Sequence, residues 1–249
     1  MDHAALERVL LRVSEMVCAL PQLREMDINP LIVDATGAVA VDARIVVDGA
    51  PQAQAGGTGQ FAHLAILPYP SRFEQTLTLR GGDTCHVRPI RPDDAQMLQN
   101  LVRGLSPESR YFRFVSSFNE LPATMLSRFT LIDYDREMAL VAVVRERTAA
   151  ENGSFTELDR IVGVSRYVIT PDQQGCEFSL VVAEDMKGRG LGSRLMESIM
   201  DVARDRGLAE VDGLVLANNP DMLKLVRRIG FTVKSFPEDP DFKLVTYQL

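Results

Sequence analysis

Apolar residues recur at helical or strand spacing over most of this 249-residue chain and divide it into three blocks. In residues 1–48, the run "ALERVLLRVSEMVCAL" has the apolar period of a helix. Two strand-like runs, "INPLIV" and "AVAVDARIVV", follow around the turn signal "DATG" and predict a hairpin. Residues 49–76 are rich in glycine, alanine, glutamine and proline, a composition typical of a linker.

From residue 77 to residue 249, strand and helix patterns alternate, which predicts an α/β domain. Strands are predicted in "LTLRGGDTCHVRPI", "MALVAVV", "RIVGVSRYVI", "CEFSLVV", "VDGLVL", "FTVKSF" and "FKLVTYQL". Helices are predicted in "PDDAQMLQNLVRGL", "SPESRYFRF", "LPATMLSRFTL", "GLGSRLMESIMDVARDRG" and "PDMLKLVRRIG", where serine, proline and glycine mark several of the ends. The segment "RTAAENGSFTEL" predicts an exposed loop.

Composition narrows the kinds of partner and site that we expect. The net charge is −7 and the isoelectric point is near 5.1, which argues against a nucleic-acid partner. The three cysteines are widely spaced and form no CxxC pair, so neither a metal site nor a disulfide framework is predicted. No apolar run reaches the ~18 residues of a membrane helix, and the start lacks the apolar core of a signal peptide. We therefore expect a soluble cytoplasmic protein that does not bind membranes.

The stretch "MKGRGLGSRLM" places three glycines between an apolar strand and a helix. The first amides of a helix have no partner within the helix, and glycine leaves them uncovered, so an anion could bind there. Lys187, Arg189 and Arg194 add positive charge, and Ser193 adds a hydroxyl. The spacing fits neither a P-loop nor a dinucleotide fingerprint. From spacing alone, a phosphate site and a tight turn remain equally open.

The same stretch carries a family resemblance. "KGRGLG" resembles the Q/R-x-x-G-x-G/A acetyl-CoA motif of the GNAT superfamily of N-acetyltransferases, with lysine where glutamine or arginine is usual. "NNPDMLKLVRRIGF" is similar to the second signature of that superfamily. The resemblance implies the GNAT fold over residues 77–249, with a mixed central sheet and helices on both faces. It also implies acetyl-CoA as cosubstrate, with these candidate contacts: the strand amides of Leu180 and Val182 for the pantetheine arm, Lys187, Gly188, Arg189, Gly190, Leu191, Gly192 and Ser193 for the pyrophosphate, and Asn219.

Further motifs narrow the resemblance. "RPIRPDDA", "LSPESRYFRF", "IDYDREMALVAVV" and "CEFSLVV" resemble bacterial protein lysine acetyltransferases that are fused to an ADP-forming (NDP-forming) acyl-CoA synthetase. "EMDINPLIV…GAVAVDARI" resembles the end of an ATP-grasp domain, in which Asn29 and Asp42 match magnesium-binding positions. Because most of such a domain is missing, we expect a remnant at residues 1–48 without a working ATP site. The resemblance implies acetylation of a lysine ε-amine on a protein, with an acyl-CoA synthetase as the expected target.

Glu177 is the predicted general base of this reaction. A lysine amine with a pKa near ~10.4 is almost entirely protonated at neutral pH, so a group that accepts its proton is useful. Glu177 lies in a strand of otherwise apolar or small residues and matches the glutamate of the related lysine acetyltransferases. We expect partial burial to tune it for proton transfer. The alternative is an exposed residue on an alternating strand; Asn219, likewise, could be a plain helix cap.

Two further positions bear on the mechanism. Cys176, next to Glu177, could act as a covalent nucleophile, but a buried structural cysteine is the favoured interpretation. Val226 occupies the position where many relatives carry a tyrosine that protonates the leaving thiolate, so no acid is evident there. Two alternatives therefore stay open: a small-molecule amine acetyltransferase on the same fold, and a non-catalytic module that senses acetyl-CoA.

Overall fold

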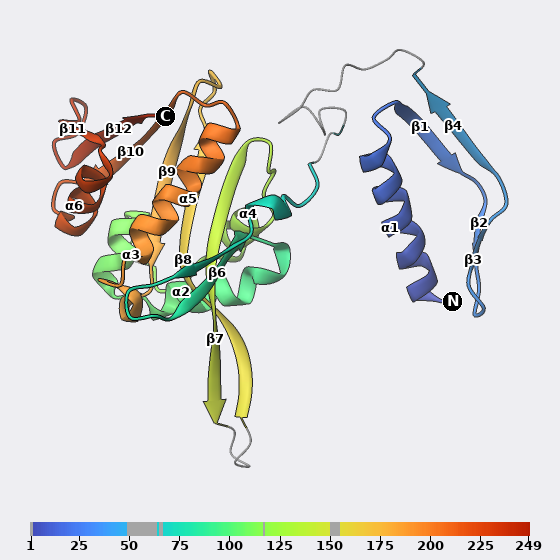
Figure 1. Cartoon of the computed structure of the whole chain (residues 1–249), viewed down its shortest axis with the longest axis horizontal. Coiled ribbons are helices and arrows are strands. Elements are labelled where there is room, and N and C mark those ends of the chain that lie inside the picture. Colours follow the sequence, from blue (N-terminus) through green and yellow to red (C-terminus); the bar gives the residue numbers. More distant parts are fainter. Residues whose placement is uncertain (1, 49–63, 65–66, 117, 150–154) are drawn as a thin grey trace. The chain divides into compact units, whose positions relative to one another are not determined.

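The computed structural model describes residues 2–48, 64, 67–116, 118–149 and 155–249 (Figure 1). Contacts between Cα atoms divide the chain into two compact units, residues 1–68 and residues 69–249. Most of the predicted linker, residues 49–63, 65 and 66, lies outside the described residues. Within the described ranges, no helix has both the length and the apolar character needed to cross a bilayer.

The first unit contains the predicted helix and a hairpin that is longer than predicted. Its elements are α1 (His3–Ala19), β1 (Leu23–Ile28), β2 (Leu31–Val33), β3 (Ala38–Ala40) and β4 (Ala43–Val47). β1 pairs with β4 and β2 pairs with β3, both antiparallel, around the "DATG" turn. Asp34 closes this turn by accepting hydrogen bonds from the amides of Thr36 and Gly37. Of the described side chains in this unit, only Ala5 is buried, so the fragment has almost no core of its own.

The second unit is built on a sheet with the order β11-β12-β10-β9-β8-β7-β6-β5. Its strands are β5 (Gln75–Thr78), β6 (Thr84–Pro89), β7 (Glu137–Ala149), β8 (Phe155–Ile169), β9 (Gly175–Val182), β10 (Glu210–Leu216), β11 (Thr232–Ser235) and β12 (Phe242–Gln248). Neighbouring strands are antiparallel, except that β9 and β10 are parallel. The expected mixed central sheet is therefore confirmed.

Helices cover both faces of this sheet, as expected (Figure 1). Three helices, α2 (Ala95–Gly104), α3 (Pro107–Phe114) and α4 (Ala123–Thr130), lie on one face, and α5 (Leu191–Asp205) lies on the other, where α6 (Pro220–Ile229) contacts it. Short 3-10 turns occur at Ser71–Phe73, Pro92–Asp94 and Glu184–Met186. Apolar residues of α5 fill the core, and Leu195 lies so close to Gly163 of β8 that a Cβ there would come within 2.8 Å of it. Gly163 thus lets α5 lie against the strands.

One predicted loop is largely strand. The segment "RTAAENGSFTEL" was expected to be an exposed loop, but β7 continues to Ala149 and β8 begins at Phe155. The two strands remain paired, with one register shift between Ala142 and Val143, as far as Ala149↔Phe155, which is well beyond the residues of β7 that pair with β6. This two-stranded extension projects from the sheet (Figure 1). The loop prediction was wrong at both ends because cross-strand pairing, which local composition does not reveal, extends the hairpin; residues 150–154 lie outside the described residues.

Residues 69–76, which the sequence assigned to the linker, form part of the second unit. Tyr69 donates a hydrogen bond from its hydroxyl to Glu74 (2.8 Å) and to the carbonyl of Pro89 (3.2 Å). The Arg91 guanidinium lies 4.6 Å from the centre of the Tyr69 ring. β5 also begins at Gln75, two residues before the predicted start of the domain.

Candidate active site

The parallel strands β9 and β10 separate in the middle of the sheet. They pair only at Gly175↔Glu210, Cys176↔Val211 and Glu177↔Asp212, although β9 continues to Val182 and β10 to Leu216. A gap therefore opens between the two strands immediately after Glu177 and Asp212. On its other edge, β9 remains paired with β8 as far as Val182.

The amides of Leu180 and Val182 point toward this gap. On β9, the Gly175 carbonyl accepts from Thr170 (2.9 Å), and just past the strand the Ala183 amide donates to Val162 on β8 (2.8 Å). Successive residues of a strand direct their N–H groups to opposite edges, so odd-numbered residues face β8 and even-numbered residues face β10. Because the ladder with β10 has ended, the amides of Leu180 and Val182 lack strand partners on that side. This geometry suits the predicted role for them, hydrogen bonding to an extended arm that lies in the gap.

The glycine stretch forms the loop that enters α5. Gly188 and Gly190 have φ values of +74° and +86°, which glycine adopts without the strain that other residues incur. Gly190 is the residue before the helix, and no side chain caps the amides of the first turn. The N-terminus of α5 thus presents uncovered N–H groups together with the positive end of the helix dipole.

Gly192 and Leu191 have packing roles that the motif does not reveal. A Cβ at Gly192 would come within 3.0 Å of Leu225, so this glycine allows α5 and α6 to approach closely. The Leu191 side chain is buried in the core. For both residues only the backbone amide is available to a ligand.

The side chains of Lys187 and Arg189 already have partners. Lys187 pairs with Glu184 (2.8 Å) and donates to the Ser109 hydroxyl (2.7 Å). Arg189 pairs with Asp83, in the turn between β5 and β6. Both cations would have to exchange these partners in order to contact a pyrophosphate directly, so the structure supports a direct role for them less strongly than it supports the role of the amides.

Beside the loop lies a hollow of about 680 Å³ whose lining holds more basic than acidic side chains. The acids are Glu197, which pairs with Arg194, and Asp201, which pairs with Arg204. Five arginines line it together with Gly190 and Ser193, and they come from the end of β5, the loop, α5 and α6: Arg80, Arg189, Arg194, Arg204 and Arg228. Arg228 donates to the Ser193 hydroxyl. Guanidinium groups suit phosphate oxygens, and the uncapped amides add further donors, so these residues fit the nucleotide end of CoA.

Arg80 and Arg228 were missed in the sequence because they lie far from the glycine motif along the chain. The turn after β5 brings Arg80 to the loop, where its amide donates to the Arg189 carbonyl (3.1 Å). A Cβ on Gly190 would lie 3.6 Å from Nε of Arg80. The only available signal was the arginine before the Gly-Gly-Asp turn, which by itself predicts nothing about a ligand.

Asn219 is a helix cap in this structure. Its side-chain oxygen accepts from the Met222 amide (3.1 Å) at the start of α6, and it is only 8% exposed. The two interpretations of Asn219 were equally open from spacing, and the cap is the role that is observed. A contact between Asn219 and the cofactor stays a prediction.

Glu177 lies on the opposite face from the helices α5 and α6. Along β9, Phe178 packs near Gly213 and Phe231, and Leu180 and Val182 lie near Gly192, so even-numbered side chains face α5 and α6. Glu177 and Ser179 consequently face the side of α3. The side chain of Glu177 is exposed, so the expected partial burial was wrong. A strand of apolar residues suggested burial, but the ladder with β10 ends at Glu177 and its side chain is exposed.

Two arginines lie on this face near Glu177. Arg113 of α3 donates to the Ser179 hydroxyl (2.9 Å) and lies 4.9 Å from the centre of the Phe114 ring. Burial and the charge of Arg166 lower the pKa of Arg113 to about 10, whereas the negative charge of Glu177 acts in the opposite direction. Arg166, only 6% exposed, pairs with Glu137 (2.9 Å). The positions of these arginines along the sequence do not reveal that they lie near Glu177, because α3 and β8 are brought together only by the fold.

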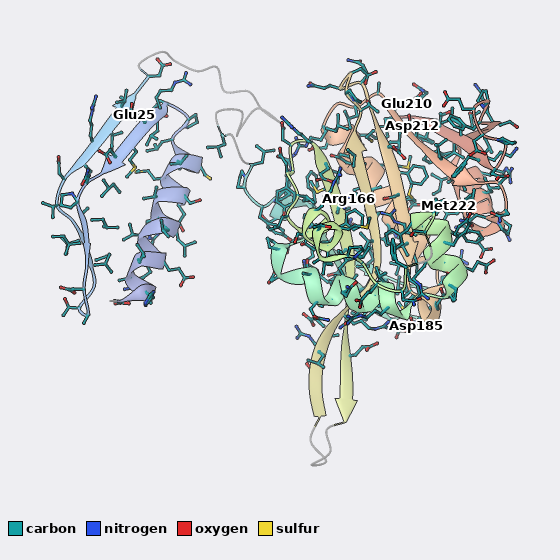
Figure 2. The ribbon with its side chains drawn as sticks, turned by 180° about the vertical axis from the view of Figure 1, so that it is seen from behind. Glu25, Arg166, Asp185, Glu210, Asp212 and Met222 are labelled. Atoms are coloured by element: carbon teal, nitrogen blue, oxygen red, sulfur yellow. The ribbon has the colours of Figure 1, made fainter. Side chains whose placement is uncertain are left out.

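Asp212 of β10 is the register partner of Glu177. Its burial raises its pKa, and the charges of Glu177, Glu210 and Asp172 raise it further. Figure 2 shows Glu210 and Asp212 together near one end of the sheet. An aspartate within the otherwise apolar strand "VDGLVL" is the sequence signal for this position.

Cys176 and Val226 are both buried. Cys176 is fully inaccessible, and burial followed by the charge of Asp212 raises the pKa of its thiol to about 12. The thiolate needed for covalent catalysis is therefore strongly disfavoured, which supports the structural interpretation of Cys176. Val226 is also fully inaccessible, so this position supplies only packing.

Comparisons with known proteins agree with this geometry. The sequence profile of the Acetyltransferase (GNAT) family matches residues 110–231, and that of an ATP-grasp domain matches residues 1–47. An acetyltransferase of Pseudomonas aeruginosa is 33% identical over 153 residues, which cover 61% of this chain and 77% of that protein. The acetyltransferase Pat of Mycolicibacterium smegmatis is 27% identical over 166 residues, which cover 66% of this chain but only 44% of that protein.

Among solved structures, the GNAT domain of S. lividans PAT superposes with a TM-score of 0.63 at 29% identity. The match covers 73% of this chain and 100% of that domain. The matched profile includes the glycine loop, Glu177 and Asp212. The chain belongs to the acetyltransferase (GNAT) family, whose members are acetyl-CoA-dependent N-acetyltransferases.

Proposed function

We propose that the protein transfers the acetyl group of acetyl-CoA to the ε-amine of a lysine on a target protein, with Glu177 as general base. The observation that carries this proposal is the position of Glu177, exposed at the point where β9 and β10 separate. There a carboxylate can meet an amine arriving from one face while the gap receives the thioester. The motifs that resemble protein lysine acetyltransferases support the choice of acceptor.

The surface around Glu177 favours a macromolecular acceptor. Val168, the register partner of Glu177 on β8, is 41% exposed, and Leu214, two residues after Asp212, is 43% exposed. Val168 shares the face of Glu177 because the two residues are register partners. Leu214 shares it because it lies two residues after Asp212, which is the register partner of Glu177 on β10. Exposed apolar residues beside a reactive group suit a protein surface better than a small polar amine, which needs an enclosing pocket.

Different residues of the site would bind acetyl-CoA and take part in the acetyl transfer. When bound, acetyl-CoA supplies the acetyl thioester. The amides of Leu180 and Val182 would hold the pantetheine arm, and the α5 amides with Arg80 and Arg228 would hold the phosphates. Glu177 takes a proton from the acceptor ammonium, directly or through a water, so that the amine can attack. The N–C bond forms as the C–S bond breaks, and the second proton of the attacking nitrogen passes to the departing thiolate or to solvent. The CoA thiol, judged by cysteine with a pKa near ~8.5, can leave as thiolate without an acid at position 226.

The proposal is tested by incubating the full chain and acetyl-CoA with a purified acyl-CoA synthetase, the expected target. We expect acetylation of a synthetase lysine, located by peptide mass spectrometry, that is strongly suppressed in Glu177→Gln. A panel of small amines runs in parallel. Rapid acetylation of a small amine with none of the protein would overturn the choice of acceptor, and full activity of Glu177→Gln would overturn the assignment of the base.

A further inference from the structure

The strand register brings a second carboxylate to the predicted base. Glu177 and Asp212 form the last paired position of β9 and β10. Parallel strands lie about 4.8 Å apart, and register partners direct their side chains to the same face. Gly213, the next residue of β10, faces the opposite side of the sheet, where a Cβ on it would come within 2.8 Å of the Phe178 ring. Both carboxylates therefore stand on the acceptor side, at the edge of the gap.

The surroundings of Asp212 leave its charge uncompensated. Among the described residues, the groups that shift the pKa of Asp212 include no cation, and its partner on β12 is the neutral Thr246. The titratable groups that face it are acids: Glu177 on β9, Glu210 on its own strand and Asp172 in the turn before β9. Cys176 remains a neutral thiol. The two arginines on this face have other partners, because Arg113 donates to Ser179 and Arg166 pairs with Glu137.

We propose that Asp212 is the second carboxylate of the proton-accepting site, and that Glu177 and Asp212 together bind the acceptor ammonium and take up its proton. This inference rests on the proposed function. An ammonium placed between two neighbouring carboxylates relieves their repulsion and is held by charge-assisted hydrogen bonds. One N–H bond then breaks, its electron pair stays on nitrogen as the nucleophilic lone pair, and an O–H bond forms on the carboxylate pair.

The two carboxylates have different environments, which suits them to different parts of this task. Asp212 is half-buried, and its raised pKa favours holding a proton. Glu177 is exposed and can pass the proton to solvent after the transfer. A pair of interacting acids titrates as a unit, so the proton belongs to the pair and not to one residue.

The first test follows the carboxyl groups directly. Carboxyl ¹³C labelling and NMR titration of the full chain give the titration midpoint of Asp212 in the wild type, Glu177→Gln and Glu210→Gln. We expect the Asp212 midpoint to fall clearly in Glu177→Gln, because the neighbouring charge is gone, and to fall less in Glu210→Gln. An Asp212 midpoint that is the same in the wild type and in Glu177→Gln would overturn the pair.

The second test follows turnover with the acceptor. We expect Asp212→Asn to lower kcat/KM for the amine by about tenfold or more, the scale of a lost hydrogen bond to a charged group. The acid limb of its pH profile should move to lower pH, because one negative neighbour has been removed. The matched control Glu210→Gln should stay within about twofold of wild type, as expected for a partly exposed charge that lies two residues before the gap. Acetyl-CoA affinity, measured by calorimetry, should be unchanged in both variants.

The results separate failure of this inference from failure of the proposed function. If the wild type acetylates the target and Asp212→Asn does so with the same kcat/KM and pH profile, the role of Asp212 is wrong and the proposed function stands. If the wild type acetylates no amine at all, the proposed function is wrong and the acceptor-binding role falls with it. Coupled titration together with a selective loss in Asp212→Asn supports the inference.

Discussion

The two faces of the sheet at the gap between β9 and β10 present different charged groups. On the side of α5, uncapped helix amides and arginines such as Arg80 and Arg228 line a basic hollow. On the side of α3, the gap begins between two carboxylates, Glu177 and Asp212. The alternation of β9 separates these regions, because successive side chains of one strand face opposite sides. The polyanionic cosubstrate and the ammonium of the proposed acceptor would therefore meet different surfaces, in a protein whose net charge is −7.

The largest expected effect is on the acidic side. We expect Glu177→Gln to lower turnover by about 10² to 10⁴, the usual contribution of a general base, and to leave acetyl-CoA binding intact, since Glu177 lies away from the basic hollow. Steady-state acetylation and calorimetry on the same preparation measure the two quantities. A parallel loss of acetyl-CoA affinity would break the division of the site into two regions.

On the basic side, Gly190→Asp should weaken acetyl-CoA binding by roughly a hundredfold, or about 2.7 kcal/mol. The new carboxylate would lie beside Arg80 and the α5 amides, where phosphate is expected. Gly190→Ala is the matched control, because it introduces the Cβ strain at φ +86° without the charge. Calorimetry that shows the same affinity for Gly190→Asp and Gly190→Ala would exclude charge as the cause.

A single arginine of the hollow should have a smaller effect. We expect Arg228→Gln to weaken acetyl-CoA binding by about tenfold at low salt and by less at high salt, where charges are screened. The neighbouring Arg227→Gln is the control, since Arg227 does not line the hollow. Equal changes in the two variants would mean that only the overall charge of α6 matters.

Asn219 tests whether α6 takes part in cofactor binding or only in folding. Loss of the cap in Asn219→Ala should lower the free energy of unfolding by about 1 kcal/mol, measured with denaturant. Asn219→Ser, which retains a capping oxygen, should recover most of this loss. If the cap is the whole role, acetyl-CoA affinity stays at the wild-type value in both variants; a selective loss of affinity would restore the predicted cofactor contact.

The smallest effect concerns Cys176. Because its thiol has a pKa raised to about 12, it stays protonated and unreactive from pH 6 to 9. Native protein treated with iodoacetamide at pH 8 should therefore be modified at the partly exposed Cys18 before Cys176, as peptide mass spectrometry would show. Rapid alkylation of Cys176 that also abolishes turnover would revive a covalent mechanism.

The elements with strong periodicity were predictable from the sequence. The α5 stretch has an apolar face and a glycine after its end, and α3 begins with Ser106 and Pro107; Ser106 accepts from the Ser109 amide as a cap should. The extension of β7 and β8 was not predictable, because it depends on pairing between two polar segments. For the same reason, the sequence pattern gave two strand-like runs in the first unit, where the structure has the four short strands β1 to β4.

The amino-acid sequence is enough to predict the family, the order of the strands and helices along the chain, the glycine loop and Glu177 as the candidate base, since these depend on local pattern and motif. Which other side chains lie beside these residues depends on the three-dimensional fold. The turn after β5 brings Arg80 to the loop, α6 brings Arg228 to Ser193, and the register of β10 places Asp212 beside Glu177. The exposure of Glu177 also depends on the fold, because the burial of a strand residue is set by where its pairing ends and by what packs above it.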